Sequence, residues 1–202
     1  MEFPQHNRRK RDQAAASDRA GFSLMETLTV IGVMSVVMMM VGQIFTAGYD
    51  VYAKQTARTE NESGAVVAGK AIADLSRGAS EIVASSTVDG TSYTTSDEVL
   101  VLKMPAIDGS NNIVVASYDY VAFARSPTDA TKILVHTQAA AGSKRRTGSR
   151  LVTAYNDVLK FRYNRADPAL AGRVQVYIVN RQTKRATAVT TKSWTAIFLR
   201  NR

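Results

Sequence analysis

The sequence predicts an α+β protein in which one long N-terminal helix precedes a domain of antiparallel β-strands. The first observation is an uncharged, mostly apolar stretch over residues 27–49. The second is the lack of proline between Pro4 and Pro105, so that nothing forces a break in a helix beginning near residue 22. The third is a series of short runs beyond residue 97 in which apolar and polar residues alternate between turn signals. Such runs are typical of antiparallel strands with one solvated face.

Composition narrows the class of protein before any motif is considered. A chain of 202 residues suits one domain plus an appendage. It contains no cysteine, which excludes disulfides, thiolate zinc sites and a cysteine nucleophile. Its formal net charge of +9 allows anionic partners but does not require them, because net charge governs association and solubility rather than fold.

Residues 27–49 are long and apolar enough for one membrane span. As a helix they would extend about 35 Å at about 1.5 Å per residue, which exceeds a hydrocarbon core of about 30 Å. Gly32, Gly42 and Gly48 leave room for close neighbours, as in helices that pack together in lipid. Lys and Arg residues are dense before the stretch and sparse directly after it. The amino end should therefore stay cytoplasmic, and the rest of the chain should be exported.

Two simpler interpretations of this stretch compete. A cleavable secretory signal would have an apolar region of about 7–15 residues and an A-x-A-like cleavage site. The run is longer here and no clean A-x-A follows it, although the small residues at 46–48 keep that option open. A plain single-span anchor fits the hydropathy alone. Neither explains Glu26, which lies at the edge of the apolar helix, where an unpaired ionisable group is costly.

The junction in front of the apolar stretch resembles a known signature. The segment Gly21-Phe22-Ser23-Leu24-Met25-Glu26-Thr27-Leu28 resembles the N-terminus of type IV pilins and of the pseudopilins of type II secretion systems. The resemblance implies that a prepilin peptidase cuts between Gly21 and Phe22, removes residues 1–21 as a cytoplasmic leader, and that Phe22 is then N-methylated. Glu26 matches the glutamate at the fifth position of the processed chain, which in that family is thought to pair with the terminal amine of a neighbouring subunit.

Elementary electrostatics provides a physical reason for a glutamate at this position. A new α-amino group at Phe22 would be mostly cationic at neutral pH, since such amines titrate near pH 8. Buried among apolar helices, that cation and the Glu26 anion would each be costly alone, and both costs fall when they meet. The alternative is an acid that favours the first turn of a helix because of the helix dipole.

We expect residues 22–50 to form the membrane-spanning and assembly half of the helix, and residues 51–84 to continue it as an amphipathic, soluble half. Apolar residues recur there at helical spacing, at Val67, Ala71, Leu75, Ala79 and Ile82. The opposite face offers two ion pairs one turn apart, Lys70 with Asp74 and Arg77 with Glu81. Small residues at 84–86 and a turn signal at 89–90 predict the end of the helix.

Residues 85–202 are expected to form the exported β-rich domain. Strands are predicted at 98–103, 112–125 and 132–137, the last two as a hairpin across residues 126–129. Three later strands are indicated by alternating apolar positions, at Leu159, Phe161 and Tyr163, at Val174, Val176 and Ile178, and at Trp194, Ala196 and Phe198.

The second half of the chain resembles one branch of that superfamily. The strand-turn-strand after residue 121, the strand at 159–163 and the tail at 196–202 resemble the J-type minor pseudopilins and W-type minor pilins. The chain departs from many pilins in its methionines at 38–40 and in lacking a proline at the middle of the helix. The resemblance implies a low-abundance subunit at or near the tip of a fibre.

The residues that enzymes and metal sites use are sparse. The histidines are His6 and His136, too few for a histidine-based triad or metal triad in the exported domain, and we expect His136 to be a packed or surface residue. Gly-rich phosphate loops are lacking, so we expect no enzyme activity and no cofactor. The segment Asp108-Gly109-Ser110-Asn111-Asn112 is rich enough in oxygen ligands to suggest calcium, but it is also what a tight turn between strands uses.

The densest basic cluster outside the leader is Lys144-Arg145-Arg146, with Arg150 nearby. Such cations can contact phosphates, including those of DNA. Without interleaved aromatic residues for base stacking, the same pattern is also that of a solvated loop.

These observations predict a structural assembly subunit, with prepilin peptidase, other pilin-like subunits and the inner membrane as its partners. The subunit would wait in the cytoplasmic membrane and then enter a pilus or pseudopilus, in the periplasm or at the cell surface. The expectation covers secretion, twitching, adhesion and DNA-uptake machines alike. The rival is a single-span, membrane-anchored, exported binding domain that does not polymerise.

Overall fold

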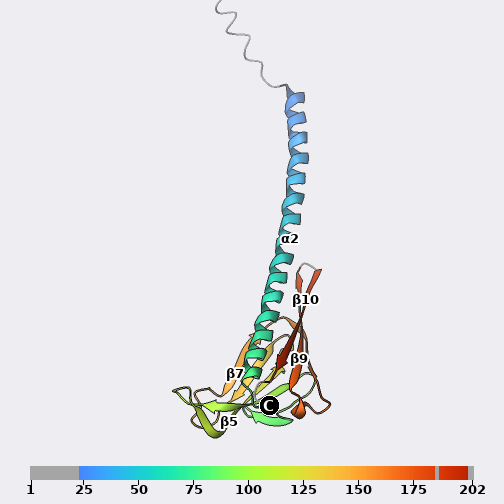
Figure 1. Ribbon diagram of the computed structural model, residues 1–202. Helices are drawn as coiled ribbons and strands as arrows, with labels where there is room; N and C mark the ends of the chain where they lie inside the picture. The colour runs from blue at the N-terminus through green and yellow to red at the C-terminus, as the bar shows by residue number, and fades with distance from the viewer. Residues whose placement is uncertain (1–22, 185–186, 200–202) are drawn as a thin grey trace, which may run out of the picture. The chain divides into compact units, whose positions relative to one another are not determined.

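The computed structural model describes residues 23–184 and 187–199, and they form an α+β arrangement of one α-helix, one short 3₁₀ helix and three antiparallel sheets (Figure 1). The chain divides into two units, Met1–Asp50 and Val51–Arg202. Chain order gives α2 (Leu24–Arg77), β1 (Glu81–Ile82), β2 (Ser85–Val88), β3 (Thr91–Thr94), β4 (Leu100–Ile107), β5 (Ile113–Arg125), β6 (Ile133–Gln138), β7 (Gly148–Thr153), β8 (Asn156–Tyr163), η1 (Pro168–Leu170), β9 (Arg173–Lys184) and β10 (Thr187–Phe198).

The helix begins at a serine cap. The Ser23 hydroxyl accepts a hydrogen bond from the Glu26 backbone N–H at 3.2 Å, and this satisfies one of the donors that a helix start leaves unpaired. Within the apolar half, the Thr29 and Ser35 hydroxyls donate to backbone carbonyls one turn earlier, at 2.8 Å each. These hydroxyls are therefore satisfied inside the helix, and the surface of this half is almost entirely apolar.

The face of the second half of α2 that packs on the sheets differs from the predicted one. Its buried residues are Ala57, Asn61, Ala65, Ala68, Gly69, Ile72, Ala73 and Ser76. Val67, a member of the predicted stripe, is 52% exposed. The reason is close packing: a Cβ added at Gly64 would lie 2.6 Å from the Thr153 Oγ1, and one at Gly69 would lie 2.7 Å from the Thr195 Oγ1. At these two positions a side chain has no room, and the buried face is therefore centred on Ala65, Ala68 and Ile72, with Val67 outside it.

The helix ends at Arg77, earlier than the predicted end at residue 84. The Gly78 and Ala79 N–H groups close the last turn by donating to the carbonyls of Leu75 and Ser76, and Ser80 then donates to the Lys103 carbonyl at 2.8 Å. The chain leaves the helix because β1 pairs with β4, which buries Ile82 in the core.

The acidic residues of both predicted ion pairs bond other partners, because the helix ends at Arg77 and Glu81 lies on a strand. Asp74 bonds Arg77 at 3.1 Å, within the last turn of the helix. Glu81, which lies on a strand and not on the helix, bonds Lys103 across β1 and β4 at 2.8 Å.

The sheets confirm the predicted strands and add others. One sheet has five strands in the order β1-β4-β5-β6-β7, a second has the order β10-β9-β8, and β2 pairs with β3. The predicted hairpin is β5–β6, in which Phe123 lies opposite Val135. Strands β1, β2, β3 and β7 were not predicted, because they are short or carry mainly polar residues.

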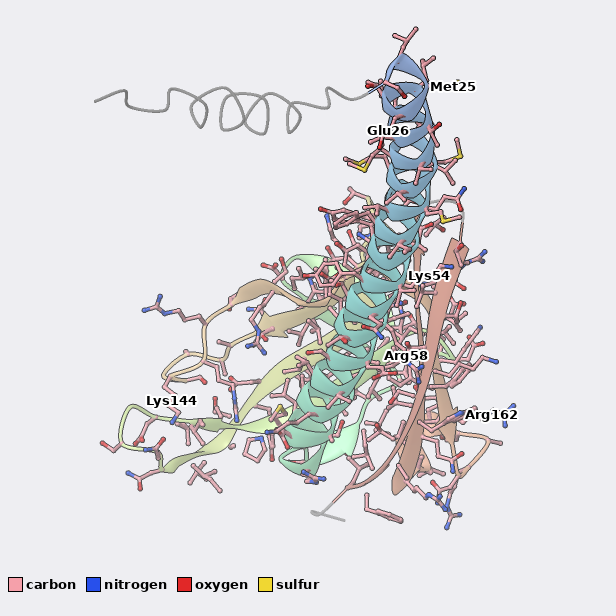
Figure 2. All side chains as sticks on the ribbon, turned by 90° about the horizontal axis from the view of Figure 1, so that it is seen from above. Met25, Glu26, Lys54, Arg58, Lys144 and Arg162 are labelled. Atoms are coloured by element: carbon pink, nitrogen blue, oxygen red, sulfur yellow. The ribbon has the colours of Figure 1, made fainter. Side chains whose placement is uncertain are left out.

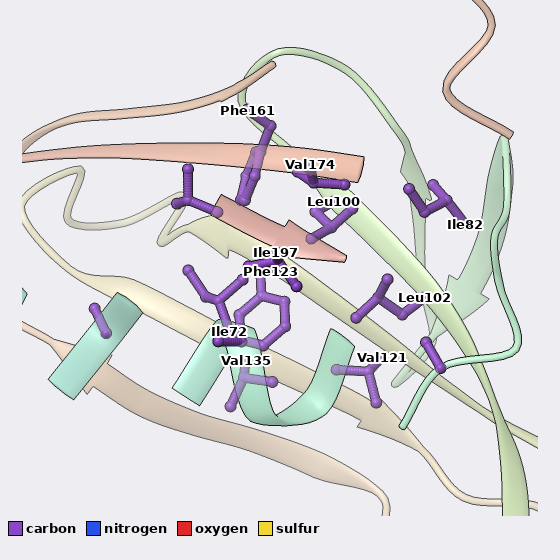
Figure 3. Close-up of a cluster of buried hydrophobic side chains, with 14 of the residues drawn as sticks. Ile72, Ile82, Leu100, Leu102, Val121, Phe123, Val135, Phe161, Val174 and Ile197 are labelled. Carbon is purple, nitrogen blue, oxygen red and sulfur yellow. The ribbon is translucent and has the colours of Figure 1, made fainter. Parts of the chain in front are cut away.

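The core of the second unit lies between the helix and the two larger sheets. Figure 3 shows Ile72 of α2 close to Phe123 and Val135 of the five-stranded sheet. The same cluster includes Phe161, Val174 and Ile197 of the three-stranded sheet, so one continuous core joins the helix and both sheets. The burial of large apolar side chains is the main stabilising term in this unit.

Buried amides also join the helix to β9 and β10. The Asn180 side chain donates to the Asn61 carbonyl at 3.0 Å, and the Asn61 side chain donates to the Val189 carbonyl at 3.0 Å. The Gln182 side-chain amide also donates a hydrogen bond to the Glu60 carboxylate at 3.1 Å. The segment Asn61-Glu62-Ser63 has the form of a glycosylation sequon, but because Asn61 is fully buried it is inaccessible in the folded unit.

Strand β10 is confirmed, but the apolar positions predicted for it do not lie on its buried face. Ile197 and, directly after the strand, Leu199 are buried, with 2% and 8% of their surface exposed. Two of the apolar positions singled out from the sequence are instead open to solvent, since Trp194 is 61% exposed and Phe198 is 62% exposed. Because successive side chains of a strand alternate between faces, these aromatic residues share the outer surface of the three-stranded sheet.

Candidate functional site

The first candidate site is the carboxylate at the start of the apolar helix. Glu26 lies in the first turn of α2 and is exposed (Figure 2). It is the only charged residue between Phe22 and Asp50. Gly21 and Phe22, the predicted cleavage positions, lie outside the described residues. An acid in the first turn lies near the positive end of the helix dipole.

The helix around Glu26 offers an apolar surface that nothing in the described structure covers. By length and composition it could cross a membrane, and none of its most apolar window is buried. The exposed side chains include Leu28, Ile31, Met38 and Ile44. So large an apolar surface indicates contact with lipid or with other helices.

The predicted basic cluster proves to be largely engaged inside its own unit. The Arg145 guanidinium is 2.5 Å from a carboxylate oxygen of Asp119 and also donates to the Pro105 carbonyl at 2.8 Å. Lys144 bonds the Asn111 side chain. Arg146 and Arg150 remain exposed. The loop therefore presents fewer available cations than the sequence indicated.

Asp119 is the centre of this loop's structure. Its side chain is fully buried, and it accepts hydrogen bonds from the Ala140 backbone N–H and the Ser143 hydroxyl, each at 2.8 Å, in addition to Arg145. A buried carboxylate needs several donors because it has lost its water. The arrangement fixes residues 140–145 against β5.

The oxygen-rich segment after β4 is a tight turn. One carboxylate oxygen of Asp108 accepts from the backbone N–H groups of Ser110 and Asn112, each at 2.8 Å. These backbone bonds lower the pKa of Asp108 below its ordinary value. Within residues 23–184 and 187–199, no three His, Cys, Asp or Glu side chains gather in a way that could hold a metal ion.

His136 lies in β6, and 8% of its surface is exposed. Its ring lies 5.0 Å from the ring of Tyr93, centroid to centroid, and burial lowers its pKa. The Nε2 atom is buried and has no bonding partner among the described residues. These contacts are those of a packed residue at the contact between β6 and the β2–β3 hairpin.

The second candidate site is the outer face of the three-stranded sheet, which sequence reasoning missed. We define the outer face as the side of β8, β9 and β10 that carries Lys160, Arg162, Arg173, Tyr177, Trp194 and Phe198. Register places Lys160, Tyr177 and Trp194 side by side across the three strands. In the sequence, these residues are the positions that alternate with the core residues of each strand. Only strand pairing brings the positions from the three strands together.

Comparison with known proteins assigns the chain to no family. No family model matches the chain, and no curated protein matches it. The described structure establishes an α+β protein with one N-terminal helix long and apolar enough to span a membrane. The pilin resemblance of its N-terminus stays a prediction.

Proposed function

We propose that the chain is a pilin-like assembly subunit, cut before Phe22 and joined to its neighbours through the apolar half of α2. The observation that supports this most directly is Glu26, an exposed carboxylate in the first turn of a helix whose following residues are uncharged as far as Tyr49. In a plain membrane anchor, an acid at this place would gain only its favourable interaction with the helix dipole. In an assembly helix it has a further use, because the acid can neutralise the cationic amine of an adjacent subunit.

The composition of the same helix supports close packing between subunits. A Cβ added at Gly32, Gly42 or Gly48 would meet nothing within 4 Å. Such positions let a second helix approach, and small residues are what helices use to pack in lipid. Before assembly the membrane would cover the exposed apolar side chains, and afterwards neighbouring helices would cover them.

Processing is the first test of the proposal. We expect prepilin peptidase to remove residues 1–21 in the native host, so that the intact mass of membrane-extracted protein corresponds to a chain beginning with N-methylated Phe22. A chain that still begins at Met1, or one cut near Ala47 as a secretory signal would be, contradicts the proposal.

Glu26 provides the second test. The Glu26→Ala variant should insert into the membrane normally but lose cross-links to other subunits and lose incorporation into fibres. Ser35→Ala is the matched control, since the Ser35 hydroxyl is satisfied within its own helix. If Glu26→Ala assembles as well as the control, the chain is better described as a single-span, membrane-anchored, exported binding domain that does not polymerise.

The subunit so proposed is structural and not an enzyme. The likeness of the strand at 159–163 and the tail at 196–202 to J-type and W-type minor subunits supports a place at or near the tip of a pilus or pseudopilus. A tip subunit should be present in few copies per fibre, which quantitative mass spectrometry of sheared fibres would measure. A copy number equal to that of the major subunit contradicts this placement.

A further inference from the structure

The outer face of the three-stranded sheet carries exposed aromatic rings in a fixed geometry. The rings of Trp194 and Tyr177 are stacked, with centroids 4.0 Å apart and an angle of 29° between their planes. Further along the same two strands, the Arg173 guanidinium lies over the Phe198 ring, 5.4 Å from its centroid. Such contacts hold the rings in place before a ligand arrives, so little conformational freedom is lost on binding.

Basic residues outnumber acidic ones on the three strands that carry these rings. The three strands carry one acidic residue, Asp157, and the basic residues Lys160, Arg162, Arg173, Arg181, Lys184 and Lys192. Lys160 forms ion pairs with Asp97 at 2.6 Å and with Glu98 at 3.0 Å, so its charge is largely neutralised within the unit. Arg162 is exposed and points away from α2 (Figure 2). The buried Nε of Arg173 has no acceptor among the described residues.

Two neighbouring hollows lie on this face and share Arg162. One has a volume of about 340 Å³ and is lined by Lys160, Arg162, Tyr177 and Trp194, together with Asp97 and Phe161. The other has a volume of about 200 Å³ and is lined by Arg162, Tyr163, Asn164, Arg173 and Gln175. The first hollow is bounded by an aromatic stack, and the second by two guanidinium groups and two amides.

We infer that the outer face binds single-stranded nucleic acid. A base stacks on the exposed side of Trp194 in the larger hollow, and backbone phosphates lie at Arg162 and Arg173 beside the smaller one. A second ring, Phe198, is four residues further along β10, about 13 Å at the usual rise of a strand. A second base of the same nucleic acid strand can therefore stack there. Alternating stacking rings and cations are the two elements from which proteins build such sites.

The chemistry of the face favours this ligand over other anions. An acidic peptide would use the arginines but would leave the flat ring of Trp194 without a matching planar group. A duplex keeps its base faces inside the stack, where Trp194 does not reach them. The loop at 144–146 supplies cations without aromatic rings, and two of its three cations are already bonded within the unit. The outer face, unlike that loop, combines both elements.

Trp194 makes the inference directly measurable, since it is the single tryptophan of the chain. The full chain in detergent would be titrated with an oligothymidylate of about twelve residues, within the site sizes of single-strand binders. We expect saturable quenching of the tryptophan fluorescence as bases stack on the exposed indole. An oligonucleotide that binds with no change in this fluorescence overturns the inference, because binding is then elsewhere.

Variants separate stacking from charge. Trp194→Ala should weaken binding about 5- to 150-fold, the range of losses found when one stacking aromatic is removed, measured by anisotropy of a labelled oligothymidylate. Arg162→Gln should reduce the slope of log K against log salt by about 0.7, the value for one phosphate contact on a single strand. Trp194→Phe, which keeps an aromatic ring, should retain most of the affinity.

Arg146→Gln is the matched control, because it removes the same charge from an exposed position on the loop. It should leave the affinity nearly unchanged. Equal losses for Arg162→Gln and Arg146→Gln would show non-specific attraction and contradict the inference. So would equal affinity for the single strand and for heparin or duplex DNA. None of these outcomes depends on assembly, so they are distinguishable from a failure of the proposed function.

Discussion

Replacing Asp119 with alanine should destabilise the second unit strongly. The fully buried Asp119 carboxylate accepts three hydrogen bonds, from the Ala140 N–H, the Ser143 hydroxyl and the Arg145 guanidinium. Removing it leaves three donors without this acceptor, including the Arg145 cation, whose side chain is 22% exposed. Breaking a buried ion pair costs about 3–5 kcal/mol. Because water can still reach Arg145, we expect the lower part of that range, about 3 kcal/mol.

Thermal unfolding of the full chain in detergent, followed by Trp194 fluorescence, measures this loss. A change of about 3 kcal/mol corresponds to a fall in Tm of about 6–12 °C for a chain of this size. Arg146→Ala is the control, since an exposed neighbouring arginine should change the free energy of unfolding by less than about 0.5 kcal/mol.

A double-mutant cycle tests the physical cause of the loss. Arg145→Ala alone leaves the Asp119 charge buried, so it should also destabilise the unit, and the double variant should cost less than the two losses added together. A coupling free energy of at least about 1 kcal/mol is expected for residues in one buried network. Additive losses, or a Tm for Asp119→Ala within about 1 °C of the unchanged chain, would refute the idea that a buried ion pair stabilises this loop.

Two further predictions test the core and its response to acid. Ile72→Ala should cost about 2–5 kcal/mol of unfolding free energy and Val67→Ala less than about 0.5 kcal/mol, because Ile72 is fully buried and Val67 is half-exposed; equal losses would contradict the buried face of α2. Between pH 7 and pH 5 the stability should fall as pH drops below 6.5, since burial lowers the pKa of His136 from that ordinary value and the unfolded chain then binds more protons. Denaturation at several pH values should show a smaller fall for His136→Gln, and an unchanged slope would assign the effect to other groups.

The sequence determined the features of this protein that depend on local patterns. An uncharged run of membrane length, a single acid at its start and the alternation of Leu159, Phe161 and Tyr163 can all be recognised one segment at a time. The longer strands and the β5–β6 hairpin were therefore predictable, as was the α+β class. The candidate site at Glu26 also came from the sequence, because its meaning lies in its neighbours along the chain.

Only the tertiary structure decided how the faces of these elements are used. The buried face of the helix includes Gly64 and Gly69 because β7 and β10 approach too closely there for a side chain, and a periodic pattern carries no information about that distance. The pairing of Asp119 with Arg145 joins residues far apart in the chain, which removed a cation from the predicted basic cluster. The outer face exists because strand pairing brings Lys160, Tyr177 and Trp194 into one row, and long-range register of this kind is fixed by the core on the other side of the sheet.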